Sequence, residues 1–391
     1  MVCAGWRWGW YFSAITACAG ERVCHGLWRP LDEWFWVGVD LFFVLSGFLI
    51  TGILYDSLRD PHYFRNFYVR RALRIFPIFY GFFLALLLLR PLLHLQMDRG
   101  MWAFPFYVGN LTMPFSDLGH HDPSVITMGV RGHIGTVGNI SHLWSLCVEE
   151  QFYLIWPAVV LLVRDRKRLM QLCVVLSVVT LALRVFLYAH LSQQMIDNML
   201  IFRSTYTRWD TLLVGSWLAL FLRGKALSPV QVRRSSAWLL WVCAGLLGGG
   251  EFVWGRGGTV FTNPFTQTVG YTLFAFAAAA VVLIALDDNS LVSRAMRTKW
   301  ISELGVVSYG FYFYHLLDID VLIRLARKHP GASMVIPFVA FGVTLGVAWL
   351  SFRYFETPFL RLKRVLAPQH VGTEAKGFVP VRLHVSEPEV G

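Results

Sequence analysis

Long apolar segments separated by short polar loops run along most of this chain. About ten of them have the hydropathy of membrane-spanning helices, which need about 20 mostly apolar residues to cross a bilayer core. They cover residues 5–19, 34–55, 75–95, 143–163, 170–191, 208–222, 237–254, 267–286, 303–323 and 334–353. The first segment is short and ends at Glu21 and Arg22. The pattern predicts an all-α fold, a polytopic membrane bundle of about ten transmembrane helices.

One long stretch between these segments, residues 96–141, is rich in Gly, Pro, Asn and His. Its apolar part, residues 101–115, is short and is interrupted by proline. Irregular backbone is tolerated at membrane depth only where protein or water covers it. We therefore expect residues 101–115 to lie at the interface or to re-enter the membrane without crossing it.

Arginine and lysine residues cluster in alternate loops, which indicates the orientation of the bundle because cytoplasmic loops are rich in these residues. The basic segments are 56–74, 164–169, 223–236, 287–302 and the chain after 353, and one loop, 324–333, disagrees. Ten spans with both termini cytoplasmic fit best. We expect one transmembrane domain over residues 1–366, with an atypical first span in 1–33, and a polar, disordered cytoplasmic tail over 367–391.

The composition agrees with a membrane protein, since 56% of the 391 residues are hydrophobic and only 15% are charged. The formal net charge of +11 is explained by the basic loops, so it does not indicate a nucleic-acid partner. The six cysteines show no spacing typical of a metal site. We expect neither a bound metal nor a disulfide framework.

Several spans carry ionisable residues, and each costs roughly 2.5–3.5 kcal/mol near the centre of a bilayer. Glu149 and Glu150 stand side by side, and His142 lies two helical turns before Glu149 on the same face. Other polar residues that the predicted topology places in the middle and outer half of the membrane are His25, Asp40, Arg208, Asp210, Tyr312 and His315. They predict a central polar cavity filled with water. An alternative stays open: Glu149 and Glu150 are buried partners of arginine side chains on neighbouring helices.

Three arginines stand at the start of the third span: Arg70, Arg71 and Arg74. Helical spacing places Arg74 on the same face as the other two. They can anchor the helix to anionic headgroups. They can equally bind a phosphate group, because a guanidinium matches phosphate oxygens with two parallel hydrogen bonds. Near the end of the last span, the spacing of Arg353 and Glu356 favours a local ion pair.

Six stretches resemble one protein family, the acyltransferase 3 family of integral membrane proteins that O-acylate bacterial surface glycans. They occur in order over residues 38–358: GVDLFFVLSGFLIT (38–51), YVRRALRIFP (68–77), HLWSLCVEEQFYLIWP (142–157), RWDTLLVG (208–215), LGVVSYGFYFYH (304–315) and SFRYFETP (351–358). Two positions depart from the family pattern, since Ala14 replaces an expected arginine and Cys147 an expected serine. Together the stretches are specific.

The resemblance implies transfer of an acyl group, usually acetyl, from cytoplasmic acyl-CoA to a hydroxyl of a cell-surface or lipid-linked carbohydrate. The location it implies is the bacterial inner (cytoplasmic) membrane. The family's donor-binding arginines correspond to Arg71 and Arg74, with Arg70 adjacent, and its essential first-span histidine corresponds to His25. Lipopolysaccharide O-antigen, capsule and exopolysaccharide are all possible acceptors.

We expect general-base catalysis by a histidine, His25 first and His142 second, because the unperturbed pKa of histidine suits proton transfer near neutral pH. Asp40 or Glu149 would orient the imidazole, and Glu150 stands beside them as a further catalytic candidate. Ser46 or a histidine could carry the acyl group covalently. Arg208, Asp210, Tyr312 and His315 are expected to line the cavity. The rival function is a transporter or flippase of a lipid-linked sugar or small anion, without acyl transfer.

Overall fold

A computed structural model describes residues 37–115, 124–130, 133–197, 199–224, 228–254, 263–315 and 335–367 of the chain. Within these ranges seven helices are long and apolar enough to cross a membrane: Val37–Asp56, Tyr63–Leu93, Ser141–Val163, Arg166–His190, Val230–Trp254, Thr266–Leu286 and Phe338–Lys363. The protein is therefore a polytopic helical membrane protein. The count of ten spans, the cytoplasmic termini and the domain limits stay predictions, because the first span and the tail lie outside the described residues.

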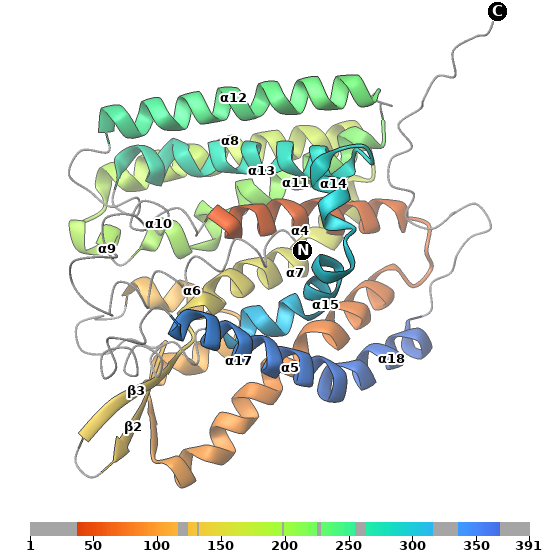
Figure 1. The fold of residues 1–391 in the computed structure, drawn as a ribbon. Helices are drawn as coiled ribbons and strands as arrows, with labels where there is room; N and C mark the ends of the chain where they lie inside the picture. Colours follow the sequence, from red (N-terminus) through yellow and green to blue (C-terminus); the bar gives the residue numbers. More distant parts are fainter. Residues whose placement is uncertain are drawn as a thin grey trace, which may run out of the picture.

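The long helices lie side by side in layers (Figure 1). Their bounds are Val37–Asp56 for α4, Tyr63–Leu93 for α5, Trp144–Val163 for α7, Arg166–His190 for α8, Trp209–Leu222 for α11, Pro229–Trp254 for α12, Tyr271–Leu286 for α13, Lys299–Tyr314 for α15, Ile336–Leu350 for α17 and Thr357–Leu366 for α18. At one edge α12 packs on α13, and α11 packs between α4 and α8. At the opposite edge α15 packs on α17, and α5 packs on α18.

The centre of the bundle is aromatic. Phe43, Phe79, Phe152 and Phe313 come from α4, α5, α7 and α15 and are fully buried. The rings of Phe79 and Phe313 meet edge to face at 6.2 Å, an arrangement that the ring quadrupoles favour. These four helices therefore share one packed core, and the same four surround the pocket described below.

Helices α4 and α11 approach each other closely, and two glycines permit this contact. A Cβ atom at Gly47 would lie 1.9 Å from the carbonyl oxygen of Leu212, and one at Gly215 would lie 2.0 Å from that of Val44. Membrane helices associate through such small residues because lipid offers no hydrophobic driving force between them. The two glycines thus determine how closely α4 and α11 approach.

Helix α5 begins at Tyr63, twelve residues before the predicted start of the third span at residue 75. Residues 63–74, which were counted in the basic loop 56–74, therefore belong to the helix, and this agrees with the helical spacing expected of Arg70, Arg71 and Arg74. At about 1.5 Å per residue the 31 residues measure about 46 Å, more than the ~30 Å of a bilayer core. The hydropathy pattern marks only the apolar part of a helix, so it missed the polar turns at the start.

Between α5 and α7 the chain forms short helices and a small sheet, which corrects the all-α prediction. The elements are β1 (Leu95–Met97), η1 (Arg99–Phe106), α6 (Gly109–Thr112), η2 (Met113–Phe115), β2 (Val125–Val130) and β3 (His133–Asn139). The sheet is antiparallel in the order β1-β2-β3, and Leu95 pairs with Met128. Its strands contain several glycines and no clear alternation of apolar and polar residues, so the sequence signal was weak. The depth of 101–115 in the membrane stays a prediction.

The last long helix contains a π-helical turn, η7 (Ser351–Glu356), between α17 and α18. The predicted ion pair between Arg353 and Glu356 is absent from this described segment. The guanidinium of Arg353 lies 5.9 Å from the centre of the Trp349 ring. The carboxylate of Glu356 is buried and accepts a hydrogen bond of 3.5 Å from Ser351 Oγ. A π turn is wider than an α turn, so residues three apart no longer share a face.

We predict that Gly215→Ala lowers the thermal stability of the detergent-solubilised protein, because the added methyl group overlaps the α4 backbone. Overpacking of this kind costs about 1–3 kcal/mol. The matched control is Gly245→Ala on α12, where nothing lies within 4 Å of the added atom. The control should be neutral or slightly stabilising, because alanine favours helices. Equal melting temperatures for the two variants would contradict the close α4–α11 contact.

Candidate active site

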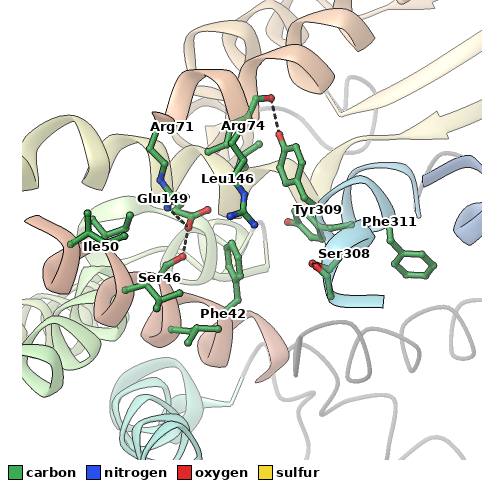
Figure 2. Close-up of a pocket in the computed structure, with 16 residues that line it drawn as sticks. Phe42, Ser46, Ile50, Arg71, Arg74, Leu146, Glu149, Ser308, Tyr309 and Phe311 are labelled. Carbon is green, nitrogen blue, oxygen red and sulfur yellow. Dashed lines mark hydrogen bonds and ion pairs between the residues drawn. The ribbon is translucent and has the colours of Figure 1, made fainter. Parts of the chain in front are cut away.

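A pocket of about 320 Å³ lies between α4, α5, α7 and α15 (Figure 2). Its walls consist of apolar side chains together with at least one polar side chain from each of the four helices. The polar members are Ser46, Arg71, Arg74, Glu149, Ser308, Tyr309 and Tyr312. A mostly apolar cleft with a few convergent polar groups is the usual form of a ligand site. This is the candidate active site.

Helical periodicity explains why these residues meet. On α4 the lining residues Phe42, Ser46, Leu49 and Ile53 are spaced three or four apart, so they share one face. The α15 residues that line the pocket repeat at a similar interval, through Gly305, Ser308, Tyr309 and Tyr312. One face of each helix therefore forms one wall.

Glu149 is the most enclosed polar residue of the pocket, with 3% of its side chain exposed. Its Oε1 atom accepts hydrogen bonds from Ser46 Oγ and Tyr153 Oη. Arg71 Nη2 lies 3.7 Å from the same oxygen, and the Arg71 guanidinium lies 3.9 Å from the centre of the Tyr153 ring. Glu149 is thus the buried partner of an arginine on a neighbouring helix and also lines the pocket, and its catalytic role stays a prediction.

Arg74 is the least engaged charge of the pocket. Its guanidinium points into the pocket (Figure 2), and within the described chain it has neither a hydrogen bond nor an ion pair. The carboxylate of Glu356 lies within electrostatic range of Arg74. Arg74 is therefore available to a ligand.

Arg70 does not line this pocket. Its Nη2 atom donates a 2.7 Å hydrogen bond to the carbonyl oxygen of Ala367, at the end of α18. Of the three arginines predicted to bind the donor, the structure brings Arg71 and Arg74 into the pocket and places Arg70 between α5 and the end of α18.

The carboxylate of Glu150 has different neighbours from that of Glu149. It lies within electrostatic range of Arg71, Tyr107 and Tyr309. No described residue donates a hydrogen bond to its buried Oε1 atom, and the buried hydroxyl of Tyr107 is likewise unpaired in the described structure. Burial raises the pKa of Tyr107 far above its usual range, and the charge of Glu150 raises it further. The phenol therefore stays protonated beside a carboxylate whose Oε1 has no described donor.

The rings of His142 and His315 contact each other, with their centres 4.8 Å apart. Both rings also contact the ring of Tyr312. His142 is 8% exposed, and its Nε2 atom lies 3.1 Å from the carbonyl oxygen of Phe313. The hydroxyl of Tyr312 donates a 2.5 Å hydrogen bond to the carbonyl oxygen of His142. Because Tyr312 also lines the pocket, it connects the two histidines to the candidate active site.

The backbone carbonyls select the tautomers of both histidines. A carbonyl oxygen only accepts, so His142 carries a proton on Nε2 and, when neutral, a lone pair on Nδ1. His315 Nδ1 lies 2.5 Å from the carbonyl oxygen of Tyr312, so its neutral form has the lone pair on Nε2. Asp40 is ion-paired with Arg208 and Glu149 with Arg71, and orientation of the catalytic imidazole by one of these carboxylates stays a prediction. The first histidine candidate, His25, lies outside the described residues.

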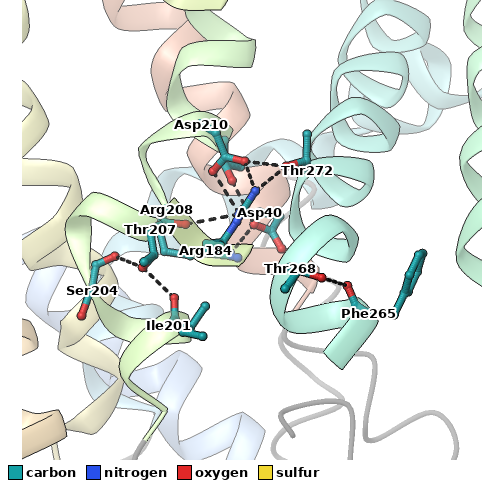
Figure 3. Close-up of polar contacts among 11 residues, drawn as sticks. Asp40, Arg184, Ile201, Ser204, Thr207, Arg208, Asp210, Phe265, Thr268 and Thr272 are labelled. Carbon is teal, nitrogen blue, oxygen red and sulfur yellow. Dashed lines mark hydrogen bonds and ion pairs between the residues drawn. The ribbon is translucent and has the colours of Figure 1, made fainter. Parts of the chain in front are cut away.

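Asp40, Arg208 and Asp210 form a second polar centre, apart from the residues that line the pocket (Figure 3). Asp40 is ion-paired with Arg208, and Arg184 Nη2 lies 2.6 Å from Asp210 Oδ2. All four side chains are fully buried. Thr272 Oγ1 donates to Asp210 Oδ2 at 2.8 Å. Arg208 and Asp210 were expected to line the cavity, but neither is among the residues that line the pocket described here.

Sequence reasoning overlooked three residues of these two centres. Arg184 interrupts the apolar run 170–191, and a charge inside a predicted span was the signal that could have found it. Tyr153 lies one turn after Glu149 on the same helix face, which is the spacing of interacting pairs. Tyr309 was not distinguished from the other aromatic residues of its span. Among the described residues no group of three or more His, Cys, Asp or Glu side chains is arranged to hold a metal ion.

Comparisons with known proteins indicate the family to which the chain belongs. A family model described as an acyltransferase domain matches residues 6–353. The peptidoglycan O-acetyltransferase OatA of Listeria monocytogenes is 29% identical over 333 residues, which are 82% of this chain and 51% of that protein. The O-acetyltransferase OatA of Staphylococcus aureus is 26% identical over 341 residues, 82% of this chain and 52% of that protein.

A third relative, the putative peptidoglycan O-acetyltransferase YrhL of Bacillus subtilis, is 29% identical over 344 residues, 82% of this chain and 50% of that protein. The chain thus spans about half the length of the curated relatives it matches. No solved structure matches the chain.

We predict that Asp210→Ala strongly destabilises the protein, because it leaves Arg184 charged and buried. Removing one partner of a buried pair costs about 3–5 kcal/mol. The exposed pair of Arg297 and Asp288 is the control, and Asp288→Ala should cost less than about 1 kcal/mol. Thermal unfolding in detergent compares the variants. The double variant Arg184→Met/Asp210→Leu should recover part of the loss, and a double variant no more stable than Asp210→Ala would contradict the pairing.

Proposed function

The chain belongs to the acyltransferase domain family, and from this premise we propose that it is a membrane O-acetyltransferase. It would move an acetyl group from acyl-CoA, bound from the cytoplasmic side, to a glycan hydroxyl on the outer side of the cytoplasmic membrane. One observation carries the proposal. The pocket between α4, α5, α7 and α15 contains an arginine, Arg74, that has no ion pair among the described residues, together with the bound pair of Arg71 and Glu149.

The arginines favour a donor that carries phosphate. The Arg74 side chain is exposed and has no ion pair among the described residues, and phosphate oxygens match the two parallel donors of a guanidinium. The pocket volume of about 320 Å³ is at the lower end for ligand sites, about 300–1,000 Å³. A pocket of this size suits the acyl-thioester arm of a CoA donor and leaves the nucleotide outside, at the end of the bundle where α5 begins.

Peptidoglycan is the acceptor that we propose first. Relatives from Listeria monocytogenes and Bacillus subtilis carry peptidoglycan O-acetyltransferase in their names. Lipopolysaccharide O-antigen, which the sequence left open, has no support from these names. Peptidoglycan also fits the kind of acceptor that the resemblance implied, a carbohydrate hydroxyl on the outer side of the membrane.

The proposed chemistry uses a histidine as general base. His142 would take the proton of the acceptor hydroxyl as that oxygen attacks the thioester carbonyl, and the CoA thiolate would leave. The Phe313 carbonyl, which accepts from Nε2, leaves Nδ1 of the neutral ring as the basic atom. Tyr312 would hold His142 in position beside the pocket through its hydrogen bond to the His142 carbonyl oxygen.

One contact in the pocket also supports a covalent route. Ser46 Oγ donates a hydrogen bond to Glu149, which is the arrangement in which a carboxylate activates a hydroxyl nucleophile. Among the carriers considered from the sequence, this contact favours Ser46. In this route Ser46 Oγ would attack the thioester carbonyl, give its proton to Glu149 and form an ester as the CoA thiolate leaves. The glycan hydroxyl would then attack that ester and release the Ser46 hydroxyl.

We predict that Arg74→Gln weakens the binding of acetyl-CoA to the purified protein at least about tenfold, because a charge-assisted phosphate contact is lost. Arg90→Gln, an exposed change at the far end of the same helix, is the matched control and should bind normally. Calorimetry or fluorescence competition measures the affinity. A wild-type protein that does not bind acetyl-CoA would favour the rival carrier function, since a carrier of lipid-linked sugars has no use for this donor.

We predict that His142→Ala lowers acetyl transfer to peptidoglycan by at least about a hundredfold at equal membrane protein content, the usual share of a general base. His190→Ala removes an exposed histidine of α8 and should leave transfer unchanged. The acetyl content of isolated cell walls gives the rate. Ser46→Ala tests the covalent route in parallel. Equal activity of His142→Ala and His190→Ala would exclude His142 as the base.

A further inference from the structure

Beyond the pocket, α18 brings another positive charge to the arginines of α5. Lys363 lies within electrostatic range of Arg70, Arg71 and Arg74, and α18 packs directly on α5. We call these four residues the α5–α18 cationic cluster. Two of its members line the pocket, and the other two lie outside it, so the cluster extends from the pocket toward the start of α5.

The end of α18 is held at this place by two hydrogen bonds from α5. Arg65 Nη2 donates to the carbonyl oxygen of Leu366 at 3.0 Å, and Arg70 Nη2 donates to that of Ala367 at 2.7 Å. Carbonyls at a helix C-terminus lack partners within the helix and attract cations. Lys363, one turn earlier, is therefore held in position by the packing of α18 on α5.

The acids near the cluster lie beside its arginines: Asp60 is within electrostatic range of Arg70, Glu150 of Arg71 and Glu356 of Arg74. Lys363 has only the three arginines within electrostatic range, so the positive charge without a counterpart is at Lys363. Glu149 pairs with Arg71 inside the pocket, and the side chain of Lys363, which is half buried, has no ion pair with any described carboxylate. Positive charges that face one another repel, and partial burial reduces their screening by solvent. Such a cluster is stabilised when an anion binds between its members.

The size of the pocket indicates which anion this is. The cavity of about 320 Å³ has room for the thioester arm of the proposed donor but not for its nucleotide. The nucleotide carries a pyrophosphate and a 3′-phosphate, and it must lie where the arm leaves the pocket. On the side of α5 and α18 that position is the cationic cluster.

We propose that Lys363 of α18, together with Arg70 and Arg74, binds a phosphate group of the CoA nucleotide just outside the pocket. The proposal deepens the proposed function and depends on its donor being acyl-CoA. It gives α18 a role in donor binding that goes beyond closing the bundle, and it makes Lys363 a residue that favours full CoA over shorter thioesters.

The test compares ligands that share the thiol arm and differ in phosphate: CoA, 3′-dephospho-CoA and pantetheine. The wild-type chain, Lys363→Gln and Lys363→Arg are measured in neutral detergent and in nanodiscs with and without anionic lipid. We expect Lys363→Gln to weaken CoA binding about tenfold and to raise the KM for acetyl-CoA with little change in kcat. Pantetheine binding should not change, and Lys363→Arg should retain most of the affinity.

Arg361→Gln is the matched control, because it removes the same charge from an exposed position two residues away, on another face of α18. It should bind CoA as the wild type does. If the effect of Lys363→Gln disappears with 3′-dephospho-CoA, the contact is the 3′-phosphate, and if it persists, the contact is the pyrophosphate.

Three results would overturn the proposal. Equal weakening of CoA and pantetheine would show a packing role for Lys363. Unchanged CoA affinity, with an altered response only to anionic lipid, would assign the cluster to lipid headgroups. A wild-type protein that binds none of the three ligands would overturn the proposed donor as well, so the two failures are distinguishable.

Discussion

Two buried arginine–aspartate pairs are the interaction on which the rest of the bundle depends. Asp40 with Arg208 and Asp210 with Arg184 join α4, α8 and α11, and Thr272 adds α13. Ionised groups taken out of water are tolerated only when each finds its partner, so the pairs penalise any other arrangement of these helices. They hold one face of α4 against α11, where Gly47 lets the backbones meet, and this leaves the opposite face of α4 to form the pocket wall.

The two polar centres differ in charge balance, and that difference separates a structural role from a functional one. The centre at Asp40 and Arg208 has as many acids as bases and is fully enclosed. The pocket centre holds Arg74 without an ion pair in the described chain, beside the single bound acid Glu149. An enclosed neutral cluster offers nothing to a ligand. A cluster that is short of negative charge, and is open to a cavity, gains free energy when an anion enters.

Hydropathy predicted a polytopic helical protein, and helical spacing placed Arg71 and Arg74 on one face of a helix, but it did not predict that Glu149 lies beside them. It did not show that Asp40 belongs to another site, because the cost of an ionisable residue in a span is the same whether its partner is structural or functional. Which helices are neighbours is decided by packing, as at Gly215, and a single sequence carries no signal for it. The start of α5 was missed for a different reason: polar turns of a helix look like a loop when only apolar content is read.

The three consecutive polar residues of α7 show how one helix serves three neighbours. Successive residues of a helix point about 100° apart, so Glu149 meets Ser46 and Arg71, while Glu150 lies near Tyr107 and Tyr309. Gln151 turns to the segment before α7, where its Nε2 atom donates to the carbonyl oxygen of Tyr107 at 2.6 Å and to Asn110 Oδ1 at 3.0 Å. Such a run would be costly on a helix that faces lipid. It is stable on α7 because protein surrounds that part of the helix, so the position of α7 at the centre of the bundle and the polarity of this run require each other.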